Sequence, residues 1–194
     1  QDHSVSRSLM ATVKSKPGLW RTLARGDRLS GTGAVEVDVL WPPREELKPA
    51  DTNDTSMVLR IAYANRRVLL CGDVEEFALR QLIAMADLRA DVLVLPHHGG
   101  VTPMTAAFVR AVGPAICLRS SARPAPATLV QMLEGRHLLS TSENGAIEIR
   151  ITPDGLCVVP TVPLRLCPLA SKADSPLNYG SPVLSPPPGK PVRP

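Results

Sequence analysis

The stretch RVLLCGDVEEFALRQLIAMADLRADVLVLPHHGG, at residues 67–100, decides the fold. It holds two apolar runs, and polar side chains follow each run. Gly72-Asp73 follows the first run, and His97-His98-Gly99-Gly100 follows the second. Carboxylate and imidazole groups bind metals, so the stretch raises two questions: how its runs pair, and whether their ends form one site.

The order of patterns predicts a crossover between two parallel strands. Residues 74–88 place apolar side chains on one helical face. These are Leu79, Leu82, Ile83 and Ala86. Residues 90–96 form a continuous apolar run, typical of a strand buried on both faces. A strand–helix–strand crossover brings both strand ends to one edge of a sheet, so we expect Asp73 and His97 to lie close together.

The rest of the chain predicts a mixed α/β domain. Buried strands that alternate with helices suggest a sheet covered by helices on at least one face. Strands are expected at 34–43, 57–63, 67–71 and 115–120, and a loop is expected at 44–55. Helices are expected at 6–18, from Thr102-Pro103 onward and at 126–135, and a hairpin at 137–160 should close the domain. Thr102 should cap its helix, with Pro103 at the first position.

Composition limits the function classes. Hydrophobic residues make up 44% of the 194 and aromatics 3%, so the core must be largely aliphatic. No run approaches the roughly 18 apolar residues of a membrane span, so we expect no transmembrane segment in this chain. The net charge of +4, without a Lys/Arg run, permits contact with a polyanion but does not argue for it. Residues 163–194 are Pro-rich and aperiodic, which predicts a disordered tail.

The four cysteines do not suggest a disulfide framework or a zinc knuckle. None belongs to a C-x-x-C pair. Cys71 and Cys117 stand in apolar runs, where a free thiol behaves as a small hydrophobic group.

Asp73 and the two histidines have both a chemical and a structural interpretation. A carboxylate with an imidazole is a common ligand set for zinc, manganese or iron. Asp73 with Glu76 also fits a capping box for the following helix. Adjacent histidines on a strand point to opposite faces, so we expect only one of His97 and His98 to bind a metal.

Other candidate ligands are weaker. Asp51 and Asp54 fit turn positions in a polar loop, and His137 fits a surface position before a strand. A catalytic zinc usually has three protein ligands and an open position. The predicted site is therefore short of at least one ligand within this chain.

Several ordered motifs resemble one family. They are Asn53 and Ser56 before a strand, Gly72-Asp73 after LL, PHHG at 96–99, and Thr141 with Gly145 before a closing strand. Together with a Gly26-Asp27 turn, they are similar to the metallo-β-lactamase-like domain at the C-terminal end of the ComEC family of competence proteins. The resemblance covers roughly residues 7–153, and the ordered set is more specific than any single motif.

The resemblance implies an αββα sandwich of which residues 1–162 would form the C-terminal half only. It implies a divalent zinc or manganese ion at Asp73 and one of His97 and His98, with Asn53, Ser56 and Gly99 in the pocket. It further implies hydrolysis of DNA or another phosphodiester within a bacterial membrane-associated DNA-uptake protein. The remainder of that polypeptide, including a transmembrane channel region, would then be a partner of this domain.

Departures from the family pattern leave alternatives open. The family's H-x-H-x-D-H motif is absent, Gly100 replaces a serine, and SARPAPA at 121–127 replaces a G-H-P motif. The chain could be half of a hydrolase domain, inactive alone, with the other ligands upstream of Gln1. It could instead be a degenerate, non-catalytic module that supports the channel protein. As an independent protein, it would be expected to leave one face of its sheet uncovered.

Overall fold

The computed structural model describes residues 4–16, 18, 21–45, 52–85 and 87–162. The predicted tail at 163–194 lies outside these residues, as do Asp51, Ala86 and Cys167.

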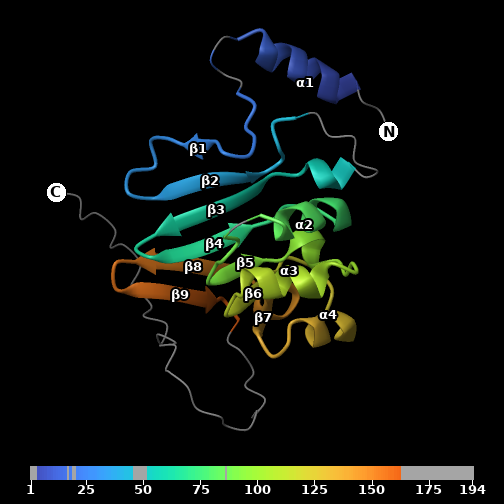
Figure 1. Cartoon of the computed structure of the whole chain (residues 1–194), viewed down its shortest axis with the longest axis vertical. Coiled ribbons are helices and arrows are strands. Elements are labelled where there is room, and N and C mark those ends of the chain that lie inside the picture. Colours follow the sequence, from blue (N-terminus) through green and yellow to red (C-terminus); the bar gives the residue numbers. More distant parts are fainter. Residues whose placement is uncertain (1–3, 17, 19–20, 46–51, 86, 163–194) are drawn as a thin grey trace, which may run out of the picture.

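A seven-stranded mixed sheet forms the centre of the fold, with its strands in chain order (Figure 1). The strands are β1 (Arg28–Leu29), β2 (Glu36–Trp41), β3 (Val58–Tyr63), β4 (Arg66–Leu70), β5 (Val92–Val94), β6 (Ile116–Arg119) and β7 (His137–Ser140). Strands β1 to β4 pair antiparallel, and β4 to β7 pair parallel. The mixed α/β class is confirmed, as are the predicted strands that became β2 to β6.

The β3–β4 hairpin shows how local sequence sets this sheet. Tyr63 pairs with Arg66, which leaves Ala64 and Asn65 as a two-residue turn. Both turn residues have positive φ, 48° and 61°. Such turns match the right-handed twist of the flanking strands, and Asn tolerates this conformation. The predicted hairpin is confirmed.

Helices cover one face of the sheet and a second hairpin covers the other. The helices are α2 (Glu76–Ile83), α3 (Thr105–Val112) and α4 (Ala127–Met132), and the hairpin consists of β8 (Ile147–Thr152) and β9 (Gly155–Pro160). Successive side chains of β4 point to opposite faces of the sheet. Leu69 therefore packs in the core on the helix side, and Val68 packs in the core on the hairpin side. Figure 1 shows these layers around the sheet.

This arrangement corrects two expectations. The predicted hairpin at 137–160 is wrong in its first half, because residues 137–140 are β7, which pairs parallel to β6. The short helix α5 (Thr141–Asn144) follows, and only β8–β9 forms the hairpin. The expectation of an uncovered sheet face is also wrong, since Val158 packs against Val92, Ile116 and their neighbours on that face.

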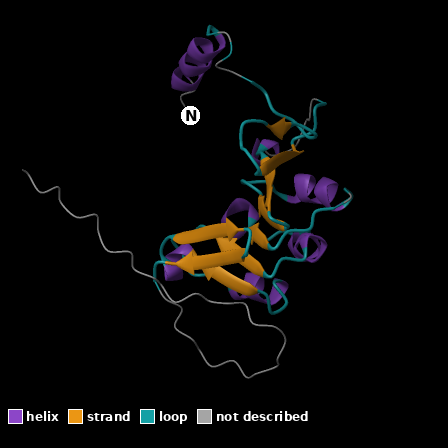
Figure 2. Ribbon diagram, turned by 90° about the vertical axis from the view of Figure 1, so that its left-hand side faces the viewer, coloured by secondary structure: helices purple, strands orange, loops and turns teal. Residues whose placement is uncertain are grey.

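The helix boundaries differ from the prediction, since α2 ends at Ile83 rather than at 88 and α4 ends at Met132 rather than at 135. Helix α1 (Ser4–Lys14) ends before the predicted position, and it stands apart from the sheet in both ribbon views (Figures 1 and 2). Helix α3 begins at Thr105 rather than just after Thr102. Thr102 instead accepts a hydrogen bond from the Met104 N–H at 3.2 Å, and its own N–H donates to the Thr105 hydroxyl at 2.8 Å. These bonds form a turn that precedes the helix.

The cysteine prediction is confirmed for the thiols that pack in the core. Cys71 and Cys117 are free and buried. Burial raises the pKa of both thiols, that of Cys117 to about 11, so both stay protonated and inert at neutral pH. No helix among the described residues is long and apolar enough to cross a membrane.

The start of α2 is held by a residue distant in sequence. Asp54 lies buried in the 3-10 helix η1 (Thr52–Thr55). Its Oδ1 accepts hydrogen bonds from the backbone N–H groups of Glu75 at 2.8 Å and Ala78 at 3.0 Å. The predicted capping role of Asp73 is therefore wrong, and so is the assignment of Asp54 as a simple turn residue. Asp54 supplies the acceptor that the free N–H groups of a helix start require.

Replacement of Asp54 by Ala should lower the free energy of unfolding by about 1–2 kcal/mol, because two N–H groups at the start of α2 lose their acceptor. The matched control is Asp73→Ala, which should change stability by less than about 0.5 kcal/mol. Urea denaturation of the full chain, followed by circular dichroism, measures both. Equal losses in the two variants would contradict the assigned cap.

Candidate functional site

The candidate site lies where β4 and β5 end. These strands pair in parallel through Leu69 with Leu93 and Leu70 with Val94. The loops that follow them are joined by a hydrogen bond of 3.0 Å, which the His97 N–H donates to the Gly72 carbonyl. The crossover thus brings the two loops to one edge of the sheet, as the order of patterns predicted.

Asp73 and His98 face each other at this edge. The distance between Asp73 Oδ1 and His98 Nε2 is 3.6 Å, and both side chains are substantially exposed. The other ring nitrogen of His98, Nδ1, lies 2.9 Å from the Ser120 carbonyl. A carbonyl only accepts hydrogen bonds, so Nδ1 carries a hydrogen in this arrangement.

That assignment decides what Nε2 can do. In the neutral tautomer, Nε2 presents a lone pair toward the Asp73 carboxylate, and two acceptors repel each other. A proton or a metal cation between them removes the conflict. Metal-binding histidines typically donate their other ring N–H to a carbonyl or carboxylate, as His98 does here. Two ligands of a tetrahedral zinc lie roughly 3.4 Å apart, close to the observed separation.

His97 has different partners. Its Nδ1 lies 2.8 Å from Glu75 Oε1, and the same oxygen accepts a hydrogen bond of 2.9 Å from Asn53 Nδ2. Both histidines belong to the 3-10 turn η2 (Pro96–Gly99), with left-handed φ values of 44° and 54°. The expectation that they alternate across a strand is therefore wrong. The turn nevertheless gives them separate environments, and only His98 faces Asp73.

The described residues offer fewer donors than a catalytic metal site requires. They contain no group of three or more His, Cys, Asp and Glu side chains arranged to hold a metal ion. Asp73 and His98 fit two ligand positions, whereas a catalytic zinc usually has three. The donor set therefore fits a divalent cation in chemistry and spacing but is short by at least one ligand.

Two predicted pocket residues shape the backbone around the site. Ser56 packs against the Gly72 turn, where an added Cβ would lie 3.1 Å from the Ser56 Cβ. Gly99 packs against Arg119, where an added Cβ would lie 2.9 Å from both Cδ and Nε. Asn53 acts through Glu75, as described above. His137 is an exposed residue at the start of β7, as predicted.

A shallow groove of about 940 Å³ borders the histidine turn. It runs along the carboxyl end of β6, and its polar lining comprises His97, His98, Arg119, Ser120, Ser121, Arg123, Thr128, Thr141 and Ser142. Sequence reasoning missed Arg119 and Glu75. A usable signal existed for Arg119, which ends the apolar run 115–118 just as Asp73 and His97 follow theirs.

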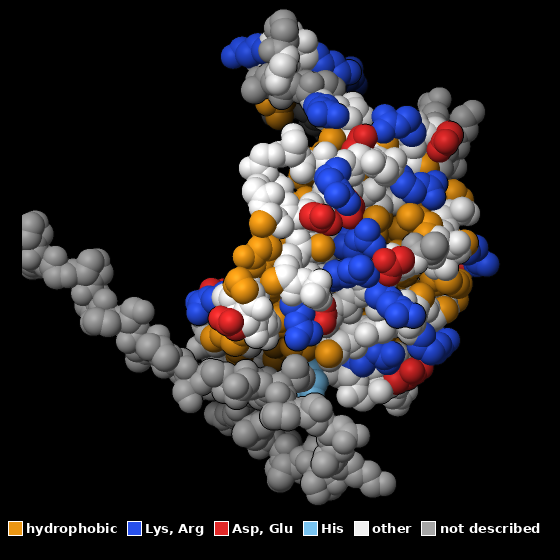
Figure 3. Space-filling model, turned by 60° about the vertical axis from the view of Figure 1, so that its left-hand side comes forward, with side chains coloured by type: hydrophobic (Ala, Val, Ile, Leu, Met, Phe, Trp, Pro, Cys, Tyr) orange, Lys and Arg blue, Asp and Glu red, His pale blue; other side chains and the backbone are white. Residues whose placement is uncertain are grey.

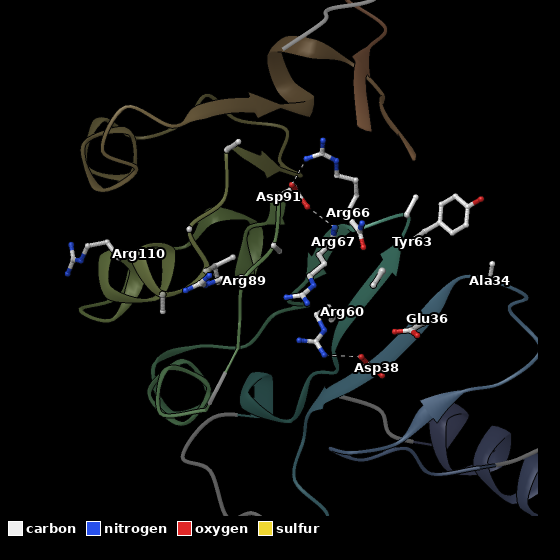
Figure 4. A pocket seen from close by; sticks show the side chains of 18 residues that line it. Ala34, Glu36, Asp38, Arg60, Tyr63, Arg66, Arg67, Arg89, Asp91 and Arg110 are labelled. Atoms are coloured by element: carbon white, nitrogen blue, oxygen red, sulfur yellow. Dashed lines mark hydrogen bonds and ion pairs between the residues drawn. The ribbon is translucent and has the colours of Figure 1, made fainter. Parts of the chain in front are cut away.

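A second cleft of about 760 Å³ lies at the opposite, amino ends of the parallel strands. Arginines and carboxylates interleave there (Figures 3 and 4). The ion pairs are Arg60–Asp38 at 3.0 Å, Arg66–Asp91 at 3.1 Å, Arg67–Asp87 at 3.0 Å and Arg110–Glu134 at 2.8 Å. Burial raises the pKa of Asp38, but hydrogen bonds from Arg28 and Arg60 outweigh it and hold that pKa below its usual value. Because carboxylates in or beside the cleft pair with most of its arginines, we interpret it as structural.

Comparison with known proteins gives two modest similarities. No family model matches the chain. The chain is 31% identical over 131 residues to competence protein ComA of Neisseria gonorrhoeae, which takes in 63% of this chain and 19% of that protein. It is 29% identical over 134 residues to ComE operon protein 3 of Bacillus subtilis (strain 168), which takes in 65% of this chain and 17% of that protein. The aligned part thus spans about a fifth of the length of these curated relatives.

Replacement of Gly99 by Ala should destabilise the chain more than the same change at Gly135. Both glycines have φ of +79°, but only Gly99 has close neighbours, whereas nothing lies within 4 Å of the Gly135 position. Backbone strain of about 1–2 kcal/mol is common to both changes, and overpacking against Arg119 adds about 1–3 kcal/mol at Gly99. Thermal and urea unfolding of the two variants measure the difference. Equal losses would show that Arg119 does not lie tightly against the histidine turn.

Proposed function

We propose that this chain is part of a bacterial, membrane-associated competence protein involved in DNA uptake, and that it contributes to a metal-dependent phosphodiester hydrolase site. The similarity to competence proteins supports the first part. One observation carries the second part: Asp73 and His98 face each other 3.6 Å apart at the ends of two parallel strands. The remainder of the longer polypeptide, including a transmembrane channel region, is the proposed partner.

Asp73 Oδ1 and His98 Nε2 are the proposed ligands of a divalent cation, zinc or manganese. The Ser120 carbonyl holds the His98 ring in the tautomer that leaves Nε2 free. Glu75 and Asn53 hold His97, which in turn fixes the conformation of the turn that carries His98. A bound divalent cation would polarise a phosphoryl oxygen and so favour attack at phosphorus.

The remaining ligands would come from outside the described residues. A pair of ligands holds a metal weakly and does not define an open coordination position. The chain alone should therefore bind a divalent cation with low affinity and hydrolyse phosphodiesters at no useful rate.

A non-catalytic module is the second candidate. The described residues offer two facing donors rather than three, and the His97 Nδ1 is occupied by Glu75. Both observations fit a degenerate domain that supports a channel protein. Metal binding separates the candidates, because a purely structural module needs no metal at Asp73 and His98.

The full, tag-free chain should bind one zinc or manganese ion in isothermal titration calorimetry. Asp73→Asn and His98→Ala should each weaken the binding by at least the roughly 10- to 100-fold that loss of a supporting residue causes. His137→Ala is the control, since this exposed imidazole begins β7 at the opposite edge of the sheet and should leave the affinity unchanged.

Two results would contradict the proposed metal site. One is the absence of saturable binding by the folded wild-type chain. The other is binding that survives Asp73→Asn and His98→Ala but is lost in the control.

A further inference from the structure

Arg119, the last residue of β6, is a buried cation with no counter-ion among the residues that the structure describes. Only 7% of its surface is exposed. Its Nη1 donates a hydrogen bond to the Arg123 carbonyl, and no carboxylate among the described residues forms an ion pair with it. Its Nε is buried and has no hydrogen-bond partner in the described part of the chain. Buried guanidinium groups are normally paired, so this one calls for an anionic partner.

The position of Arg119 is fixed by its neighbours. The side chain lies against Gly99, where any Cβ would come within 2.9 Å of its Cδ and Nε. Leu129 of α4 borders the same space, at 3.0 Å from that Cβ position. The buried Arg119 side chain is thus packed against the histidine turn, and little ordering remains to be done when an anion binds.

The groove in front of Arg119 has the right chemistry for a phosphate. A second arginine, Arg123, is exposed on its wall, and the described lining contains no carboxylate. Hydroxyl groups of Ser121, Thr128 and Ser142 add neutral donors. The second cleft, at the amino ends of the parallel strands, does have carboxylates in its lining, namely Glu36, Asp38 and Asp91 (Figure 4). Guanidinium groups match phosphate oxygens in geometry as well as in charge.

The groove adjoins the Asp73–His98 pair. His98 lines it, and its Nδ1 contacts the carbonyl of Ser120, the residue directly after Arg119. Gly99 also links the groove to the Asp73–His98 pair, since it directly follows His98 and packs against Arg119. An anion on Arg119 would therefore lie next to the proposed metal ligands.

We propose that Arg119 and Arg123 form a phosphate-binding subsite that holds one phosphate group of a phosphodiester beside His98. This inference rests on the proposed function, which identifies the bound ester as a phosphodiester. It adds the residues that would hold the phosphate group of that substrate class. Arg119 binds and positions the phosphate. Arg123, at the groove wall, contributes charge.

The test measures phosphate binding by the full chain in the presence of a chelator, so that it does not depend on metal. The probes are inorganic phosphate and the phosphodiester thymidylyl-thymidine, followed by ³¹P NMR line broadening and calorimetry. The wild type should bind both saturably, and Arg119→Met should weaken binding at least tenfold. Arg123→Ala, an exposed change that leaves the core intact, should weaken it several-fold. Arg150→Ala is the control, because Arg150 pairs with Glu148 on the β8–β9 hairpin.

The outcomes separate the two proposals. Phosphate binding that depends on Arg119 and Arg123, in a chain that binds no metal, would uphold the subsite and overturn the metal site. Metal binding without saturable phosphate binding would do the reverse. If Arg119→Met does not fold, unchanged phosphate binding in Arg123→Ala overturns the subsite as stated. Binding of inorganic phosphate alone, without the dinucleotide, would overturn the assignment to a phosphodiester.

Discussion

The parallel pairing of β4 with β5 determines where each polar group of the candidate site lies. Val68, Leu69 and Leu70 pair with Val92, Leu93 and Val94, so the two strands end at one edge. A shift of this register by one residue would turn Leu69 out of the helix-side core and Val68 out of the hairpin-side core. The register is therefore fixed by burial on both faces of the sheet. Asp73 and His98 face each other in the register that buries these apolar residues on both faces of the sheet.

The sheet could be predicted because its strands are marked by patterns of residues that are close together in the sequence. The apolar runs, their spacing and the crossover rule were sufficient to place Asp73 beside the histidine turn. Asp54 was missed because its capping bond to the Glu75 N–H spans 21 residues, and a local pattern offered Asp73 instead. The closing hairpin was misread for a similar reason. The apolar pair Leu138-Leu139 is compatible with a strand, but it does not say that the partner of that strand is β6.

The histidines show a second limit of local reasoning. The rule that neighbours alternate holds in strands, and His97 and His98 lie in a turn with positive φ. Their backbone conformation follows from contacts around the turn, including the bond from the His97 N–H to the Gly72 carbonyl. Glu75 and Arg119 were not predicted as site residues, since each acquires its role through a partner from another loop. A charged residue at the end of a third buried strand was nevertheless visible in the sequence.

The two ends of the sheet carry similar side chains but differ in charge compensation. At the amino ends, arginines meet carboxylates in exposed or partly exposed pairs, each worth about 0–1 kcal/mol. At the carboxyl ends, Arg119 is buried with no carboxylate partner among the described residues, and such an arrangement costs more than any exposed pair returns. The proposed anion site would offset this cost, and arginine content alone is therefore a poor guide to such a site. Burial and pairing are the better guides.

The charges around His98 also imply that the proposed metal and phosphate sites would be coupled. Asp73, with no cation beside it, repels an anion held at Arg119, and His98 lies between the two. A divalent cation on Asp73 and His98 would reverse that repulsion. By thermodynamic reciprocity, phosphate on Arg119 would then raise the affinity for the cation by the same factor. A weak two-ligand site beside a buried arginine would thus gain affinity from the substrate itself, because a phosphate oxygen can complete the coordination that the described residues leave incomplete.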